Sequence, residues 1–298
     1  MKRFISKNKK YLGYLLFALI LTVALLYYRF PSDAVLDYLQ ATANTADPRI
    51  VLSVDRVEPR LPIGLKFGKT EVSMKDMPDG VILRIDSLLL RPGLWSLLRG
   101  KPEYCFHCVA YKGDLVGCVY IEKDRTRGFI DTEIELRNIL IGDCAYLSHL
   151  IGRHIEGTLG GTVSYTGRHN LLMDGSGEAN LRLSHGRVEL LQPFLTFESI
   201  DFNEMEMEMV LKKQQINLTR LELKGQQLHG TLSGVVTLKE KFAKSSLDLR
   251  GTIEPYAESF KGKGGAHDTL KLLKHLIKNG TVSFVIHGTL GEPRIEFT

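Results

Sequence analysis

Four cysteines are the residues of this sequence best suited to redox or metal chemistry. Cys105 and Cys108 have the C-x-x-C spacing of redox and zinc sites, and Cys118 and Cys144 follow. A redox pair normally lies at a helix N-terminus, which lowers the thiol pKa, whereas residues 104–111 have the pattern of a strand. Residues three apart on a strand point to opposite faces, which disfavours a shared metal ion.

A cross-strand disulfide is the alternative that we predict. If Lys112, Gly113 and Asp114 form a three-residue hairpin loop, Cys108 faces Cys118 on the next strand. In an oxidising compartment Cys108 and Cys118 can then form a disulfide. Zinc binding and free structural thiols stay open as alternatives.

A second candidate is the run from Asn203 to Met209, in which glutamate and methionine alternate. As a strand it places three Met on one face and three Glu on the other. These residues are Met205, Met207 and Met209, and Glu204, Glu206 and Glu208. Thioethers can bind Cu(I). Because the run contains no His or Cys, we interpret it as methionines that fill an irregular apolar groove while the glutamates face water.

Motifs of catalysis are missing from the sequence. His149 and His154 do not form an H-E-x-x-H pattern, and there is no G-x-S-x-G, phosphate-binding or dinucleotide-binding motif. We therefore predict a protein that is not an enzyme, with no catalytic, cofactor-binding or metal site and no cofactor.

The N-terminal part of the sequence has the pattern of a membrane anchor. The basic residues near the N-terminus are Lys2, Arg3, Lys7, Lys9 and Lys10. They precede an uncharged, apolar run of 18 residues, Tyr11 to Tyr28, which as a helix covers about 27 Å of the ~30 Å hydrocarbon core. Basic residues beside a span stay in the cytoplasm. We thus predict a cytoplasmic segment 1–10, a transmembrane helix 11–28 and an exported remainder.

A cleaved signal peptide is the competing interpretation. Cleavage needs small residues at positions −3 and −1 of the site, whereas residues 26–31 read Leu-Tyr-Tyr-Arg-Phe-Pro. A buried core helix is disfavoured by the adjacent basic cluster. An uncleaved anchor fits the sequence best.

Charge and composition narrow the function of the exported part. The formal net charge is +5, and the first ten residues account for all of it. Because phosphate contacts supply most of the affinity for nucleic acids, we expect no nucleic-acid binding. Hydrophobic residues make up 44% of the chain, which is typical of a folded protein.

Beyond the span the sequence changes from helical to strand periodicity. A short amphipathic helix at 34–41 and a linker fill residues 29–49, and from Ile50 apolar and polar residues alternate. Strand patterns with glycine punctuation recur to the end. We predict that residues 50–298 are mainly β: an elongated, curled antiparallel sheet, open and groove-like, with a few short helices, among them 144–151 and 269–277.

Four parts of the chain together resemble the type II secretion system protein N (GspN) family. They are the basic N-terminus with its single span, and the segments Ile85–Gly100, Ile155–Gly161 and Phe284–Ile295. The G-T-L-x-x-P-x-I pattern at the end of the last segment is also similar to the AsmA and TamB-like bridge proteins, which are usually much longer.

The GspN resemblance implies a non-catalytic inner-membrane protein, exposed to the periplasm, that assists export of folded proteins across the outer membrane. The expected partners are the lipid bilayer and other type II secretion components. An open apolar groove can also hold acyl chains or a partner strand. The alternative function is therefore that of an AsmA- or TamB-like lipid-handling bridge between the two membranes.

Overall fold

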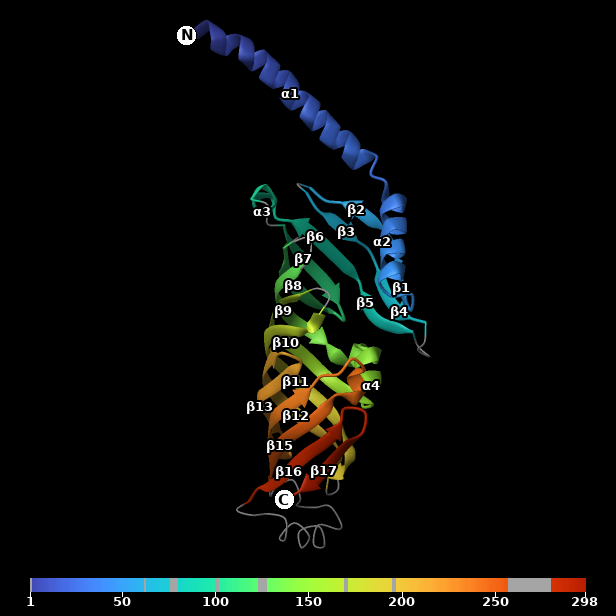
Figure 1. The fold of residues 1–298 in the computed structure, drawn as a ribbon, viewed down its shortest axis with the longest axis vertical. Coiled ribbons are helices and arrows are strands. Elements are labelled where there is room, and N and C mark those ends of the chain that lie inside the picture. Colours follow the sequence, from blue (N-terminus) through green and yellow to red (C-terminus); the bar gives the residue numbers. More distant parts are fainter. Residues whose placement is uncertain are drawn as a thin grey trace.

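Two helices precede the β-structure of this protein (Figure 1). The computed structural model describes residues 2–61, 63–75, 80–99, 102–122, 128–168, 171–194, 197–256 and 280–298. Helix α1 is Lys2–Tyr28 and helix α2 is Ser32–Ala46. Pro31 lies between them, where its missing N–H and its ring stop one helix from continuing into the next.

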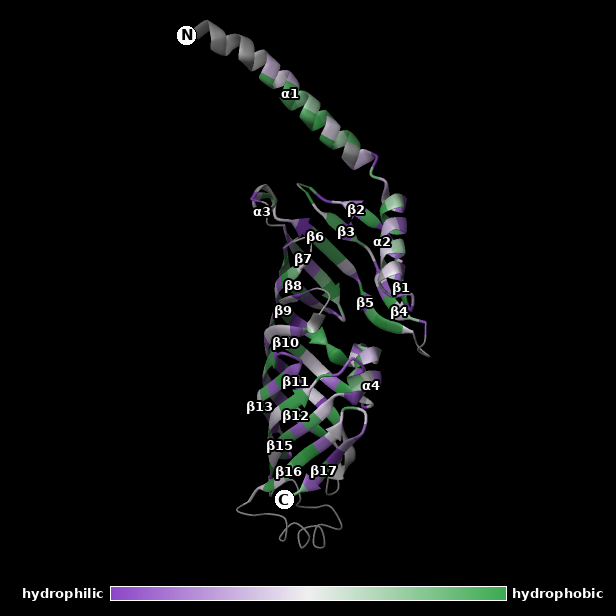
Figure 2. Ribbon diagram, viewed as in Figure 1, coloured by the Kyte–Doolittle hydropathy of each residue, from purple (hydrophilic) through white to green (hydrophobic). Residues whose placement is uncertain are grey.

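Helix α1 contains the whole run predicted to cross a membrane. Its described side chains are predominantly hydrophobic (Figure 2). Among the residues that the structure describes, no helix combines the length and the apolarity of a membrane span.

The strands form two antiparallel sheets. The smaller has the order β1-β4-β5, and the larger runs through fourteen strands from β17 at one edge to β2 at the other. In the smaller sheet the strands are β1 (Ile50–Val54), β4 (Thr70–Met74) and β5 (Val81–Ile85). In the larger sheet they are β2 (Val57–Pro59), β3 (Leu65–Phe67), β6 (Ser87–Pro92), β7 (Glu103–Ala110), β8 (Gly113–Glu122), β9 (Phe129–Leu140), β10 (Ile155–Arg168), β11 (Leu171–Phe194), β12 (Phe197–Lys212), β13 (Gln215–Gly225), β14 (Leu228–Thr237), β15 (Ser246–Pro255), β16 (Val282–Thr289) and β17 (Pro293–Phe297).

The larger sheet is elongated and curled, and it does not close on itself (Figure 1). From β6 to β17 each strand pairs with its neighbours in sequence. This hairpin-after-hairpin order confirms the prediction of a mainly β, antiparallel fold, because glycine punctuation between short alternating segments encodes local hairpins.

Alternation along the strands gives the larger sheet two unlike faces. In β9, Ile134 and Leu136 are half-buried, whereas Glu133, Glu135 and Arg137 are exposed. Because strand side chains alternate with period two, this pattern continues across the sheet as one apolar face and one polar face.

Two clusters of buried side chains lie along the sheet. The larger cluster is formed by residues of β11 to β14 and of the turn that follows β9. Its buried members are Ile141, Leu183, Ile200, Phe202, Leu223 and Leu228. The other lies on β5 and β7, and its buried members are Ile85, Cys108 and Ala110.

Short helices interrupt the strands. The helix predicted over 144–151 is present as α4 (Ala145–Ile151), preceded by the 3-10 turn η1 (Ile141–Asp143). Helix α3 (Leu94–Leu98) and the 3-10 turn η2 (Phe242–Lys244) were not predicted. The helix predicted over 269–277 lies outside the described residues.

Candidate binding face and cleft

The disulfide joins Cys105 to Cys118. The prediction that Cys108 pairs with Cys118 is therefore wrong. The two sulfurs are 2.07 Å apart. The register of β7 and β8 pairs Cys105 with Cys118 and places Cys108 opposite Leu115. Reduced Cys108 is buried and reduced Cys144 is half-buried.

The error lies in the hairpin loop. The structure has a two-residue turn, Tyr111-Lys112, with φ of 51° and 60°, the left-handed pair of a type I′ turn. Gly113 already pairs with Ala110 as part of β8. A Cβ at Gly113 would lie 2.5 Å from the carbonyl oxygen of Arg137 on β9. Glycine is therefore required by the neighbouring strand and not by the turn, which the sequence pattern alone did not distinguish.

The thiol of Cys108 is an unreactive structural group. Burial, with a smaller contribution from the charges of Asp86 and Asp114, raises the pKa of Cys108 from 9.0 to about 11. Since the thiolate is the nucleophile and the metal ligand, this thiol is suited to neither role at neutral pH.

A carboxylate lies close to the disulfide. One ligand atom each of Glu103, Cys105 and Cys118 lies within 4.8 Å of the others. The sulfurs are bonded to each other, so they offer a metal ion no thiolate.

The methionine and glutamate run lies on β12 with its two faces separated. Met205 packs against the larger cluster, and its strand partners are Leu183 and Leu223. On the opposite face, Arg182 lies 3.2 Å from Glu204 and 2.8 Å from Glu206. The structural interpretation of this run is confirmed for Met205, which packs in apolar space, and for Glu204 and Glu206, which form ion pairs at the surface.

Two histidines lie within hydrogen-bonding distance of nearby carboxylates. The Nε2 atom of His154 lies 3.0 Å from a carboxylate oxygen of Glu156, and that of His229 lies 3.1 Å from Glu222. Arg220 also bonds to Glu222 and, as the largest cause, lowers the pKa of that carboxyl. Such pairs account for shifted pKa values without a catalytic role.

The apolar face is only partly covered. Along β7 to β10, its large side chains are half-buried: Phe106, Leu115, Val119, Ile134, Leu136 and Val163. A covered core would exclude water from such side chains almost completely. This face therefore keeps apolar area available for another apolar group.

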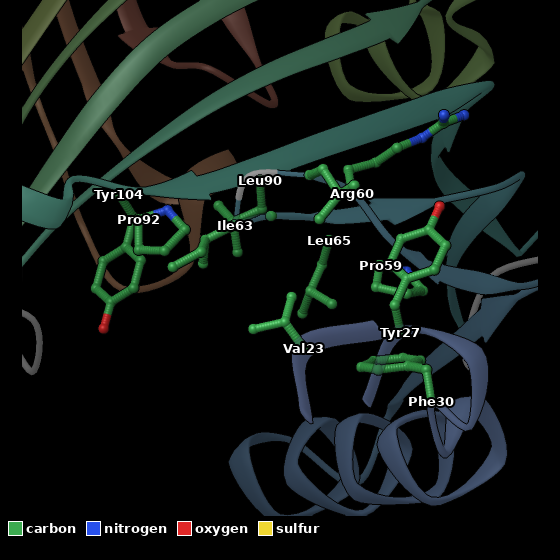
Figure 3. A pocket seen from close by; sticks show the side chains of 12 residues that line it. Val23, Tyr27, Phe30, Pro59, Arg60, Ile63, Leu65, Leu90, Pro92 and Tyr104 are labelled. Atoms are coloured by element: carbon green, nitrogen blue, oxygen red, sulfur yellow. The ribbon is translucent and has the colours of Figure 1, made fainter. Parts of the chain in front are cut away.

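A cleft lies where the apolar sheet meets α1 (Figure 3). Its volume is about 370 Å³, within the ~300–1,000 Å³ range of small-ligand sites. Its lining residues come from the end of α1, the β2–β3 turn and the adjacent ends of β6 and β7. They are Val23, Tyr27, Phe30, Pro59, Arg60, Leu61, Ile63, Gly64, Leu65, Leu90, Pro92 and Tyr104. Arg60 is the only charged residue among them, and its guanidinium points away from Val23, Ile63 and Leu65 (Figure 3), so the cleft suits an apolar chain.

Sequence reasoning did not find this cleft. It is built from segments more than 80 residues apart in the sequence, Val23 on α1 and Tyr104 on β7. A weak signal was present in Leu61-Pro62-Ile63, an apolar turn where polar residues are usual.

Comparison with known proteins gives no relative. No protein-family model, no curated protein and no solved structure matches this chain.

Proposed function

We propose that this protein is a non-catalytic periplasmic component of the type II secretion machinery, anchored in the inner membrane. The binding role is supported by the apolar face along β7 to β10, whose large side chains are only half-buried. The assignment to secretion rests on the resemblance of the chain to the GspN family. A curled sheet with one open apolar face is suited to hold an extended partner.

The anchor in this proposal is the run Tyr11–Tyr28 within α1. Large apolar side chains of α1, among them Leu12, Phe17 and Ile20, are exposed and have no protein core to enter. Exposed apolar side chains on a helix favour a lipid environment, and the basic residues of 2–10 favour a cytoplasmic N-terminus. Protease added to spheroplasts is then expected to degrade the chain beyond α1, and protection of that part would contradict this topology.

Gene deletion tests the secretion role. We expect exoproteins to accumulate in the periplasm while the lipid composition of the outer membrane stays normal. Continued secretion would refute the role.

A pair of neighbouring variants tests the apolar face. Ile134→Asn changes the apolar face, and Glu133→Gln changes the exposed face one residue away. Complementation of the deletion by Glu133→Gln but not by Ile134→Asn is expected. Both variants must first show the far-ultraviolet circular dichroism and melting temperature of the unchanged protein, because only then does the comparison report on binding. Equal complementation by the two variants would show that the apolar face is not needed for secretion.

The cleft supports a second candidate, a lipid-handling bridge module. A cleft whose lining is apolar except for Arg60, which points its guanidinium away, fits an acyl chain. This function predicts the opposite phenotype, in which deletion alters outer-membrane lipids and leaves secretion intact.

A further inference from the structure

Four large apolar side chains are exposed on the two short elements beside the cleft. They are Leu61 and Ile63 of the β2–β3 turn and Leu94 and Trp95 of α3, which we call the rim. Leu61 is 64% exposed and Trp95 is 77% exposed. Single exposed apolar residues are ordinary, but a group that includes a tryptophan marks an interaction surface.

Strand pairing places the two parts of the rim at one end of the sheet. Leu65 of β3 pairs with Leu90 of β6, so the turn before β3 lies beside the end of β6. A Cβ at Gly64 would lie 3.0 Å from the carbonyl oxygen of Leu90. Strand β6 ends at Pro92, and α3 begins two residues later.

The end of α1 reaches the same place. Val23, Tyr27 and Ile63 line the cleft (Figure 3), and Leu61 lines it as well. In Figure 1, α3 and the tips of β2 and β3 lie at the end of the sheet next to α1, and the C-terminus lies at the other end.

Charge around the rim complements an anionic lipid surface. Arg60, Arg91 and Arg99 are exposed beside it. Glu58 offers Arg60 only a distant contact of 3.9 Å. Basic side chains close to a membrane attract anionic lipids, and tryptophan prefers the headgroup layer.

We propose that the rim inserts into the headgroup layer of the bilayer that holds α1. The occupant of this surface is thus the lipid bilayer itself, and the sheet stands with its α1 end on the membrane and its C-terminal end away from it. In this arrangement the cleft opens directly toward lipid. The inference rests on the proposed anchor, and the experiment separates the two.

Trp95 reports on this contact directly because it is the only tryptophan of the chain. The full chain is reconstituted into vesicles of phosphatidylethanolamine and phosphatidylglycerol, with or without phospholipid brominated near the headgroup. Brominated lipid is expected to lower the fluorescence of Trp95 at least twofold. Leu61→Ser combined with Ile63→Ser is expected to reduce this quenching.

A matched reporter at the other end of the sheet is the control. Phe297 is exposed next to the C-terminal residue. In the double variant Trp95→Phe, Phe297→Trp the same brominated lipid is expected to leave the fluorescence almost unchanged.

The outcomes distinguish the inference from the anchor. If the chain floats with the vesicles but Trp95 is quenched no more than the tryptophan at 297, the rim does not touch the bilayer and the inference fails while the anchor stands. If the chain does not float with vesicles at all, both fail.

Discussion

The two halves of the large sheet are stabilised differently. In the distal half, β10 to β17, five buried residues on β11 to β14 form a cluster together with Ile141 of η1. In the proximal half, which comprises β2, β3 and β6 to β9, Cys108 and Ala110 of β7 form a smaller cluster with Ile85 of the neighbouring strand β5, and Val57, Phe67 and Ile139 are also buried. The proximal half instead contains the disulfide and the exposed rim.

The difference shows how one repeated hairpin pattern serves two purposes. Buried apolar area stabilises the distal half, because each fully buried large side chain contributes about 1.5–3 kcal/mol. The proximal half leaves large side chains of β7 to β9 half-buried, which suits binding, and its disulfide adds a stabilising contribution that does not depend on buried area.

Removal of a core side chain gives the largest expected effect. Phe202 is 3% exposed in the distal cluster, and Phe202→Ala is expected to lower the free energy of unfolding by about 3–5 kcal/mol. The matched variant Phe106→Ala, at a half-buried position of the proximal half, is expected to cost about half as much. Urea unfolding followed by circular dichroism measures both, and equal losses would contradict the difference between the halves.

Loss of the disulfide is expected to come next. The cross-link spans a sequence separation of 13, so replacing Cys105 and Cys118 by Ser is expected to cost about 3 kcal/mol. Hydrogen exchange should accelerate in β7 and β8 while β11 to β13 stay protected. Cys144→Ser, which removes a half-buried free thiol, is the control and should have little effect. Uniform acceleration throughout the sheet would argue that the two halves do not differ.

Alkaline pH tests the smaller cluster. The folded pKa of Cys108 is raised from 9.0 to about 11, so its contribution to stability is complete below pH 9 and is lost as pH rises toward 11. The thiol of the unfolded chain ionises first and draws the equilibrium to the unfolded state.

Cys108→Ala should therefore show a shallower loss of unfolding free energy between pH 9 and 11 than the unchanged protein. The unfolding free energy of Cys108→Ala should still fall somewhat with pH, because the pKa of Tyr111 is also raised, to about 12, and burial is the largest cause of that shift. Urea midpoints across this range measure the slope of both proteins. Identical slopes in Cys108→Ala and the unchanged protein would show that Cys108 is not buried as described.

Ion pairs of the polar face are expected to matter least. Arg182 is largely exposed and contacts Glu204 and Glu206. Arg182→Gln is expected to change the free energy of unfolding by less than about 1 kcal/mol, since exposed pairs are weak and salt-screened. A larger loss, insensitive to 0.5 M salt, would mean that the polar face stabilises the distal half as much as the core does.

Sequence reasoning succeeded where the signal is local. Period-two alternation from Ile50 and the glycines between segments predicted the strands and their antiparallel order, because hairpins join neighbours in sequence. It failed at the hairpin of β7 and β8, where the turn is one residue shorter and begins one residue earlier than predicted, which moves the partner of Cys118 from Cys108 to Cys105.

Helix α3 and the cleft were not predicted because neither has a recognisable local sequence pattern. Five residues are too few for a helical period to show. The cleft depends on the approach of α1 to the β2–β3 turn, which no local pattern encodes.

The sequence by itself determined the mainly β class, the antiparallel order and the separation of methionine from glutamate on β12, because strand alternation and turn residues act between neighbours. Only the tertiary structure decided which cysteines pair, how far the apolar face stays open and where the rim lies. These depend on register and curl, and both arise from the packing of strands that are distant in the sequence.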